Sequence, residues 1–165
     1  MPQGASVTVL SAESLIHILN VSRDKLDCGG LKLHVDKIFA FSNKGGLYNN
    51  VKKISDVVEV KPDSRGIYEL AAGAYRIRYK ELVKVPDDAL ALAIPRSTLL
   101  RIGATIFTAV WDPGYEGRGE GLMVVFNPHG IELEEGVQVA QLVFVKLDRA
   151  TRFVYRGSYY RENIT

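Results

Sequence analysis

Apolar and polar residues alternate along much of this chain, which predicts a mainly β structure. The alternation is longest over residues 31–41, where apolar side chains recur at every second position except Lys37, as in a half-buried strand. Shorter apolar segments bounded by turn residues predict further strands at 57–60, 67–70, 74–79, 89–94, 105–110, 122–126, 131–133 and 139–146. Many short strands with frequent turns are typical of a sandwich or jelly roll.

One segment near the N-terminus has helical spacing instead. Within residues 11–20, Ser11 can act as the N-cap, Glu13 lies in the first turn, and Leu15, Ile16 and Leu19 share one face. We therefore expect a single short helix before the first long strand.

Turn residues also predict how the strands connect. Residues 43–50 carry Lys-Gly-Gly at their centre, which favours a loop. The strands at 67–70 and 74–79 flank a short Ala-Ala-Gly segment, so we expect them to pair as a β-hairpin.

Composition narrows the class of protein. A chain of 165 residues fits one domain over 1–165, with the polar residues 156–165 as a candidate mobile tail. The net charge is +2, from 21 basic and 19 acidic residues, which is too balanced for charge-driven binding to nucleic acid. No apolar run approaches the roughly 20 residues of a membrane helix. Residues 1–10 lack the pattern of a secretory signal and Cys28 has no cysteine partner, so we expect a cytoplasmic protein.

A first candidate site follows an apolar strand at residues 95–103. Two arginines and two hydroxyl groups lie close together there: Arg96, Ser97, Thr98 and Arg101. The planar donor fork of arginine suits phosphate oxygens, and hydroxyl groups can donate to the same oxygens. A short helix capped by Ser97, with solvated arginines, accounts for the same residues and is commoner.

A second candidate site is the turn at residues 111–117. Asp112 stands at the end of a strand and precedes Pro-Gly, so its carboxylate would be held rigidly and could deprotonate a water molecule. Tyr115 offers a flat face for a sugar or a base. A type II turn with Asp112 at its first position explains the same residues, and the two interpretations are compatible.

A third candidate is Gln141, which lies among apolar residues in the segment 136–144. A buried amide needs hydrogen-bond partners. A bound phosphate or a neighbouring chain could supply them, and so could the protein core.

These three segments, RSTLLRIG, DPGYEG and GVQVAQLVF, resemble in order and spacing three motifs of the dUTP triphosphatase / dCTP deaminase family. A fourth segment, residues 30–33, stands in the place of the family's Gly-x-Asp-Leu motif but carries Lys32 instead of the acid. The resemblance covers most of the chain and is strongest over residues 96–144. It implies a jelly-roll-like β-clip fold and a homotrimer with active sites at the subunit interfaces.

The resemblance also implies roles for individual residues. Asp112 matches the residue that activates the attacking water, and Tyr115 the aromatic residue that packs on the deoxyribose. The phosphate-binding positions are Arg96, Ser97, Thr98, Arg101 and Gln141. The backbone that reads the base edge corresponds to Thr108, Ala109, Val110 and Trp111. The C-terminal lid, which is closer to that of the deaminase branch, corresponds to Arg156, Gly157, Tyr159 and Tyr160. A Mg²⁺ ion would be carried mainly by the triphosphate, without direct protein ligands.

The two branches of this family differ in one acidic residue. A deaminase needs a glutamate on the strand after the turn, a few residues before an asparagine. Alignment on Asn127 puts Val124 at this position, and counting from Asp112 puts Leu122 there. Neither side chain can transfer a proton, and Glu120 is expected to lie in a turn.

We therefore predict a dUTP diphosphatase that produces dUMP and pyrophosphate by water attack on the α-phosphate, with dUTP as partner and neither nucleic acid nor membrane. The alternatives are a dCTP deaminase, a bifunctional deaminase and dUTPase, or an inactive nucleotide-binding protein. Lys32 motivates the last alternative, because the acid it replaces helps to order the magnesium shell and the sugar 3′-hydroxyl.

Overall fold

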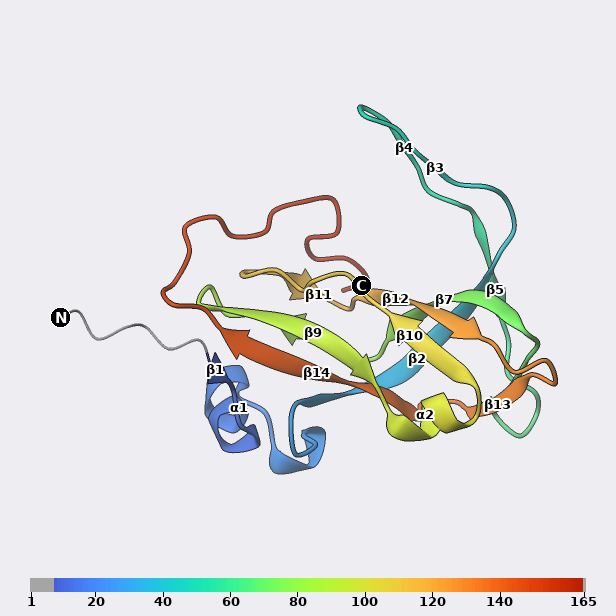
Figure 1. Ribbon diagram of the computed structural model, residues 1–165, viewed down its shortest axis with the longest axis horizontal. Helices are drawn as coiled ribbons and strands as arrows, with labels where there is room; N and C mark the ends of the chain where they lie inside the picture. The colour runs from blue at the N-terminus through green and yellow to red at the C-terminus, as the bar shows by residue number, and fades with distance from the viewer. Residues whose placement is uncertain (1–7, 165) are drawn as a thin grey trace.

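Strands make up most of the ordered elements in the computed structural model, which describes residues 8–164 (Figure 1). This confirms the expectation of a mainly β fold with a short N-terminal helix. Residues 1–7, where no secretory signal is expected, and Thr165 at the end of the tail lie outside the described residues.

An eight-stranded antiparallel sheet forms the framework. Its main path runs through β1 (Thr8–Val9), β14 (Gln138–Lys146), β2 (Leu31–Phe41), β7 (Gly73–Tyr79), β12 (Glu120–Val125) and β10 (Ala104–Phe107). Off this path, β9 (Ala89–Pro95) pairs with β14, and β5 (Val57–Val60) pairs with β2. The long strand β2 pairs with β14 through its first half and with β7 through its second half, so it joins the two parts of the curled sheet.

Three two-stranded ladders complete the fold. They are β8 (Val83–Lys84) with β11 (Glu116–Gly117), β6 (Ile67–Leu70) with β13 (Ile131–Glu134), and β3 (Gly46–Leu47) with β4 (Lys52–Lys53). The last pair forms an arm that projects from the body, within and just beyond the expected loop at 43–50 (Figure 1).

The expected hairpin between β6 and β7 is wrong. Strand β6 pairs with β13, whereas β7 pairs with β2 and β12. The reason is burial: Tyr68 and Leu70 of β6 lie opposite the apolar Leu133 and Ile131 of β13, and all four side chains are buried there. A local turn pattern cannot report such a distant partner.

The N-terminal helix α1 (Ala12–Leu19) forms as its sequence predicts. The Ser11 side chain accepts a hydrogen bond from the Ser14 N–H at 3.3 Å, which confirms it as the N-cap. The helix ends at Asn20, whose φ of 52° is left-handed, and a single 3₁₀ turn, η1 (Arg23–Lys25), follows. Ala12 and Leu15 attach α1 to the core.

The core contains apolar side chains from both parts of the sheet. Leu33, Ile38, Ile77, Met123 and Phe144 are completely buried, and they belong to one cluster. Among the described residues no charged side chain is fully buried, so the charged groups lie at or near the surface of this framework. No helix within residues 8–164 has the length and apolar character needed to cross a membrane.

Candidate functional site

A cavity of about 450 Å³ opens beside the turn at Asp112. Its wall contains residues 109–112, the start of β12, Ile54 beside the arm, and residues of the C-terminal tail. Residues that line it include Trp111, Asp112, Tyr115, Glu120, Tyr159 and Glu162.

Asp112 is fixed by backbone contacts on both sides. Before it, Trp111 and Ala91 exchange two backbone hydrogen bonds of 2.9 Å, which anchor this segment to β9. After it, the Tyr115 N–H donates to the Asp112 carbonyl at 3.0 Å, and Gly114 has the positive φ of 77° that a type II turn requires. The residue itself is exposed at the edge of the cavity. The turn therefore positions a carboxylate that solvent can reach.

Aromatic rings form one side of the cavity. Trp111 and Tyr115 are buried, and their rings meet edge to face at a centroid distance of 5.1 Å. Tyr155 of the tail extends this wall at 6.0 Å from Tyr115. A Cβ atom at Gly119 would come within 2.5 Å of the Trp111 ring, so the close approach of the backbone explains the glycine.

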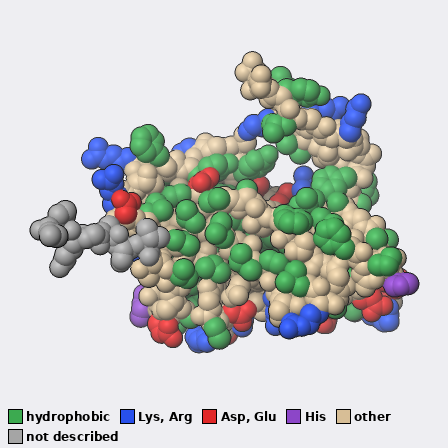
Figure 2. Space-filling view, viewed as in Figure 1, with side chains coloured by type: hydrophobic (Ala, Val, Ile, Leu, Met, Phe, Trp, Pro, Cys, Tyr) green, Lys and Arg blue, Asp and Glu red, His purple; other side chains and the backbone are tan. Residues whose placement is uncertain are grey.

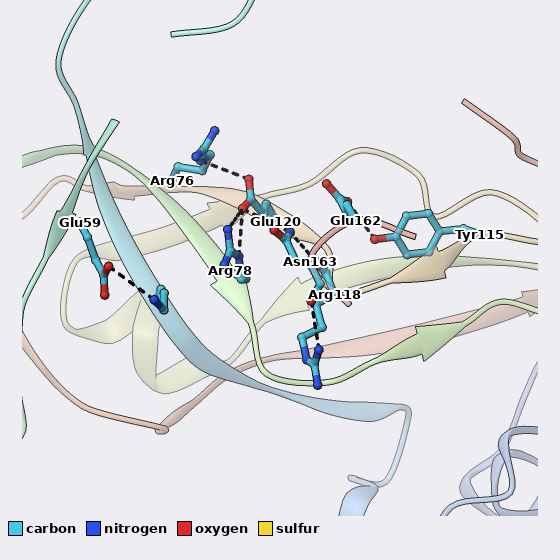
Figure 3. A network of polar contacts seen from close by, with 9 residues as sticks. Glu59, Arg76, Arg78, Tyr115, Arg118, Glu120, Glu162 and Asn163 are labelled. Atoms are coloured by element: carbon cyan, nitrogen blue, oxygen red, sulfur yellow. Dashed lines mark hydrogen bonds and ion pairs between the residues drawn. The ribbon is translucent and has the colours of Figure 1, made fainter. Parts of the chain in front are cut away.

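Two arginines hold a carboxylate at the floor of the cavity (Figure 3). Arg78 donates from Nε and Nη2 to Glu120 Oε1, both at 3.2 Å. Arg76 Nε lies 3.1 Å from Glu120 Oε2, an ion pair in which the N–H does not point at the oxygen. Both guanidinium groups also lie about 5 Å from the Phe39 ring. Glu120 is therefore neutralised on both oxygens.

The position of Glu120 corrects the expectation that it lies in a turn. Glu120 is the first residue of β12 and stands directly opposite Arg78 of β7. Since side chains alternate along a strand, Glu120 shares its face with Leu122 and Val124, the two positions reached by counting.

The C-terminal tail returns to the cavity and pairs with β11. The Arg161 N–H donates to the Glu116 carbonyl at 2.7 Å, and the Arg118 N–H donates to the Glu162 carbonyl at 3.1 Å. The Arg118 guanidinium group donates to the Asn163 carbonyl at 3.0 Å. These contacts bind the tail to residues 116–118.

Glu162 extends from this tail into the cavity. The Tyr115 hydroxyl donates to Glu162 Oε1 at 2.9 Å (Figure 3). Burial raises the pKa of Glu162 above its ordinary value, although the hydrogen bond from Tyr115 opposes the rise. Burial and the nearby charge of Glu162 also raise the pKa of Tyr115, so this hydroxyl keeps its proton and acts as the donor.

The residues expected to form a lid lie in the same tail. Tyr159 lines the cavity. Arg156 donates to the Gly114 carbonyl at 3.2 Å and stacks on Tyr160 at 4.4 Å, and the Tyr160 N–H donates to the Gly157 carbonyl at 3.1 Å. The tail thus contacts the Asp112 turn directly.

The residues expected to bind phosphate form a separate group. Arg96, Ser97, Thr98 and Arg101 are exposed on and just before α2 (Ser97–Arg101), and none of them lines the cavity. The expectation that Ser97 caps this helix is wrong, because the N-cap is Arg96 and it makes no side-chain cap. Ser97 already has its backbone inside the first turn.

Gln141 lies beside the start of this helix. Its neighbour Ala140 stands opposite Pro95 in the β14–β9 ladder, and the Arg96 N–H donates to the Val139 carbonyl at 2.9 Å. Gln141 Oε1 is buried and finds no hydrogen-bond partner within residues 8–164, so the interpretation as a satisfied core glutamine is wrong.

Lys32 adjoins this second group rather than the cavity. It stands opposite Gln141 in the β14–β2 ladder, and its ammonium group donates to the Asp24 carbonyl at 2.8 Å. Nearby Asp27 accepts a hydrogen bond from Gln138.

The candidate residues therefore fall into two separate groups, each a candidate half-site. One contains Asp112, the aromatic wall and the segment 109–111; the other contains the arginines around α2 and Gln141. Strand β9 separates them, because Ala91 pairs with Trp111 whereas Arg96 lies five residues further on, roughly 17 Å along an extended chain.

Comparisons with known proteins find relatives that match most of this chain. Residues 3–147 match a family model described as dCTP deaminase-like. The chain is 36% identical over 143 residues to a probable deoxyuridine 5′-triphosphate nucleotidohydrolase of Aeropyrum pernix, covering 87% of this chain and 89% of that protein. It is 37% identical over 143 residues to the deoxyuridine 5′-triphosphate nucleotidohydrolase of Methanocaldococcus jannaschii, covering 85% and 90%.

A solved structure shows a similar fold. The 2′-deoxycytidine 5′-triphosphate deaminase from Agrobacterium tumefaciens superposes with a TM-score of 0.64 at 15% identity. The match covers 85% of this chain and 48% of that one, so the chain spans about half the length of the deaminase.

Proposed function

Because this chain belongs to the dCTP deaminase-like family, we propose that it hydrolyses dUTP to dUMP and pyrophosphate. Several archaeal relatives that match most of its length bear the name of this activity. The observation that carries the proposal is Asp112, whose carboxylate is held by a rigid turn at the rim of a cavity with an aromatic wall.

Asp112 would act as the general base. Its carboxylate takes a proton from a water molecule as the water oxygen forms a bond to the α-phosphorus. The bond between the α-phosphorus and the oxygen bridging to the β-phosphate breaks, and pyrophosphate leaves with that electron pair. Since this chemistry depends mainly on positioning and charge neutralisation, the fixed turn is its main requirement from this half-site.

The sugar and the base would lie along the same wall. Tyr115 offers its ring to the deoxyribose, where close packing disfavours a 2′-hydroxyl group. The backbone of residues 108–111 would read the edge of the uracil. Residues 109–111 line the cavity, which supports this assignment.

The triphosphate would need the second half-site, which one chain cannot bring to its own Asp112. We propose a homotrimer in which a neighbouring subunit supplies Arg96, Ser97, Thr98 and Arg101 together with Gln141. The exposed arginines support this role, because within residues 8–164 neither Arg96 nor Arg101 forms an ion pair, which a phosphate would supply. The unpaired Oε1 of Gln141 is an acceptor, so an adjoining chain would have to supply its donor.

An apolar face supports the assembly (Figure 2). The outward sides of neighbouring strands carry exposed side chains, among them Ile94 of β9, which is 47% exposed, and Phe107 of β10, which is 56% exposed. Leu92 and Leu122 extend this face on β9 and β12. Exposed apolar side chains gathered on one face are typical of an interface between protein chains.

A Mg²⁺ ion fits this arrangement as a companion of the substrate. Within residues 8–164 no group of three acidic, histidine or cysteine side chains could form a cage for a metal ion. Mg²⁺ is commonly bound by substrate phosphates and water with one or two carboxylates. When bound, it would neutralise charge on the phosphate oxygens.

Deamination of dCTP is disfavoured by the cavity floor. The acid that faces the cavity from β12 is Glu120, and both of its oxygens already contact guanidinium groups. A proton carrier must bind and release a proton during turnover. In Glu120 both oxygens are instead occupied by contacts with Arg76 and Arg78.

The proposal is tested by incubating the purified protein with dUTP or dCTP, with and without magnesium, and separating the products by chromatography. We expect dUMP and pyrophosphate from dUTP only. Asp112→Asn should lower kcat by about 10²–10⁴-fold while the protein still binds a non-hydrolysable dUTP analogue. The control is Asp148→Asn, which changes an exposed aspartate outside the cavity and should leave kcat unchanged.

Three outcomes would contradict this assignment. Conversion of dCTP to dUTP or dUMP would favour the deaminase and direct attention to Glu120. Binding of dUTP without turnover would indicate a nucleotide-binding protein. Equal rates for the wild type and Asp112→Asn would remove Asp112 from the chemistry.

A further inference from the structure

We propose that Glu162 binds the 3′-hydroxyl group of the substrate deoxyribose, so that the C-terminal tail contributes a recognition residue to the site. This inference rests on the proposed function, because it assumes that a deoxyribonucleotide occupies the cavity.

The tail is held so that Glu162 must face the cavity. Arg161 and Asn163 have left-handed φ values of 60° and 55°, which non-glycine residues adopt only when surrounding contacts compensate. The compensating contacts come from residues 116–118, which bond to the backbone on both sides of Glu162. The Asn163 amide returns a further bond to the Arg118 carbonyl at 2.9 Å. The left-handed residues on both sides of Glu162 therefore fix the direction of its side chain toward the cavity.

The Glu162 carboxyl group retains capacity to accept a hydrogen bond. Oε1 is taken by the Tyr115 hydroxyl at 2.9 Å, whereas Oε2 has no hydrogen-bond partner within the described part of the chain. A half-buried carboxylate gains stability from each additional donor. Glu120, which lies close by in Figure 3, differs because guanidinium groups contact both of its oxygens. Oε2 of Glu162 is thus free to accept a hydrogen bond from a ligand.

The substrate offers few donors that could satisfy this oxygen. dUTP carries two neutral donors, the N3–H of uracil and the 3′-hydroxyl of the sugar. The base edge is assigned to the backbone of residues 108–111, on the Asp112 side of the cavity. Glu162 is bonded to Tyr115, the ring assigned to the sugar, so the hydroxyl is the donor within its reach.

The test pairs a change in the protein with a change in the ligand. Binding of dUMP and of 2′,3′-dideoxyuridine monophosphate is measured by calorimetry for the wild type, Glu162→Ala and Glu162→Gln. A hydrogen bond to a charged group contributes roughly 1.5–3 kcal/mol, which corresponds to about 10–100-fold in affinity. We expect the wild type to prefer dUMP by this factor, Glu162→Ala to bind the two ligands equally, and Glu162→Gln to keep part of the preference.

The matched control is Glu132→Gln, an exposed glutamate on β13 outside the cavity, which should keep the full preference. Equal losses for both ligands in Glu162→Ala would overturn the inference, because that result indicates only that the tail supports Tyr115. Tighter binding of dUMP by Glu162→Ala would also overturn it, since the side chain would then obstruct the cavity. A wild type that shows the dUMP preference but does not hydrolyse dUTP would refute the proposed activity alone. A wild type that binds neither ligand would refute both.

Discussion

Gly30 makes a contact that predicts a large and specific loss of stability on substitution. It precedes β2 and lies against β14, where a Cβ atom would overlap the Leu142 carbonyl oxygen and come within 2.8 Å of the carbonyl carbon. Leu142 is completely buried in the centre of the sheet, so the obstacle is backbone that cannot move without disturbing two ladders. Overpacking of this kind costs about 1–3 kcal/mol, and a rigid neighbour favours the upper part, about 2–3 kcal/mol.

For a chain of this size, 1 kcal/mol changes the Tm by roughly 2–4 °C, so Gly30→Ala should lower it by about 4–12 °C. Circular dichroism at a fixed protein concentration measures the change, because assembly also affects Tm. Gly29→Ala is the control, since its Cβ atom would lie 3.6 Å from Gln141 Oε1, an ordinary contact. If both variants melted within 2 °C of the wild type, or if they shifted equally, the steric argument would be refuted.

Two further predictions follow from the assembly and from the metal. Ile94→Glu places a charge on the apolar face and should shift the mass measured by light scattering from that of a trimer to that of a monomer. The control Ile18→Glu, on the exposed side of α1, should leave the mass unchanged. An unchanged mass for Ile94→Glu would exclude this face as the interface. Removal of Mg²⁺ with EDTA should abolish dUTP hydrolysis, and added Mg²⁺ should restore it. The Tm of the nucleotide-free protein should not change, since the described residues form no metal cage. A lower Tm in EDTA would instead indicate a structural metal site.

Features set by neighbouring residues were predictable from the sequence. The helix cap at Ser11 and the turn at Asp112 depend on contacts within four residues, and both form as predicted. Strand β6 has the expected bounds, and its apolar side chains Tyr68 and Leu70 are buried. Such local patterns identify elements and turns without information about the rest of the chain.

Features that depend on distant partners were not predictable. The pairing of β6 with β13 is decided by which apolar surface each strand can bury. Glu120 and Glu162 enter the cavity through contacts with Arg78 and Tyr115, which are 42 and 47 residues away along the chain. Acidic residues at these positions resemble ordinary surface residues until the fold brings their partners close.

In the proposed trimer, the separation of Asp112 from Arg96 would make each subunit depend on its neighbour. In a closed ring, every chain would complete one site with its carboxylate and another with its arginines. A chain that has lost only Asp112 could still supply its arginines to the site of an unaltered neighbour. A chain without Asp112 and a chain without Arg96 could likewise form one complete site where they meet. Inactivation would thus be a property of pairs of chains, and genetic complementation within a single gene would follow from the geometry of β9.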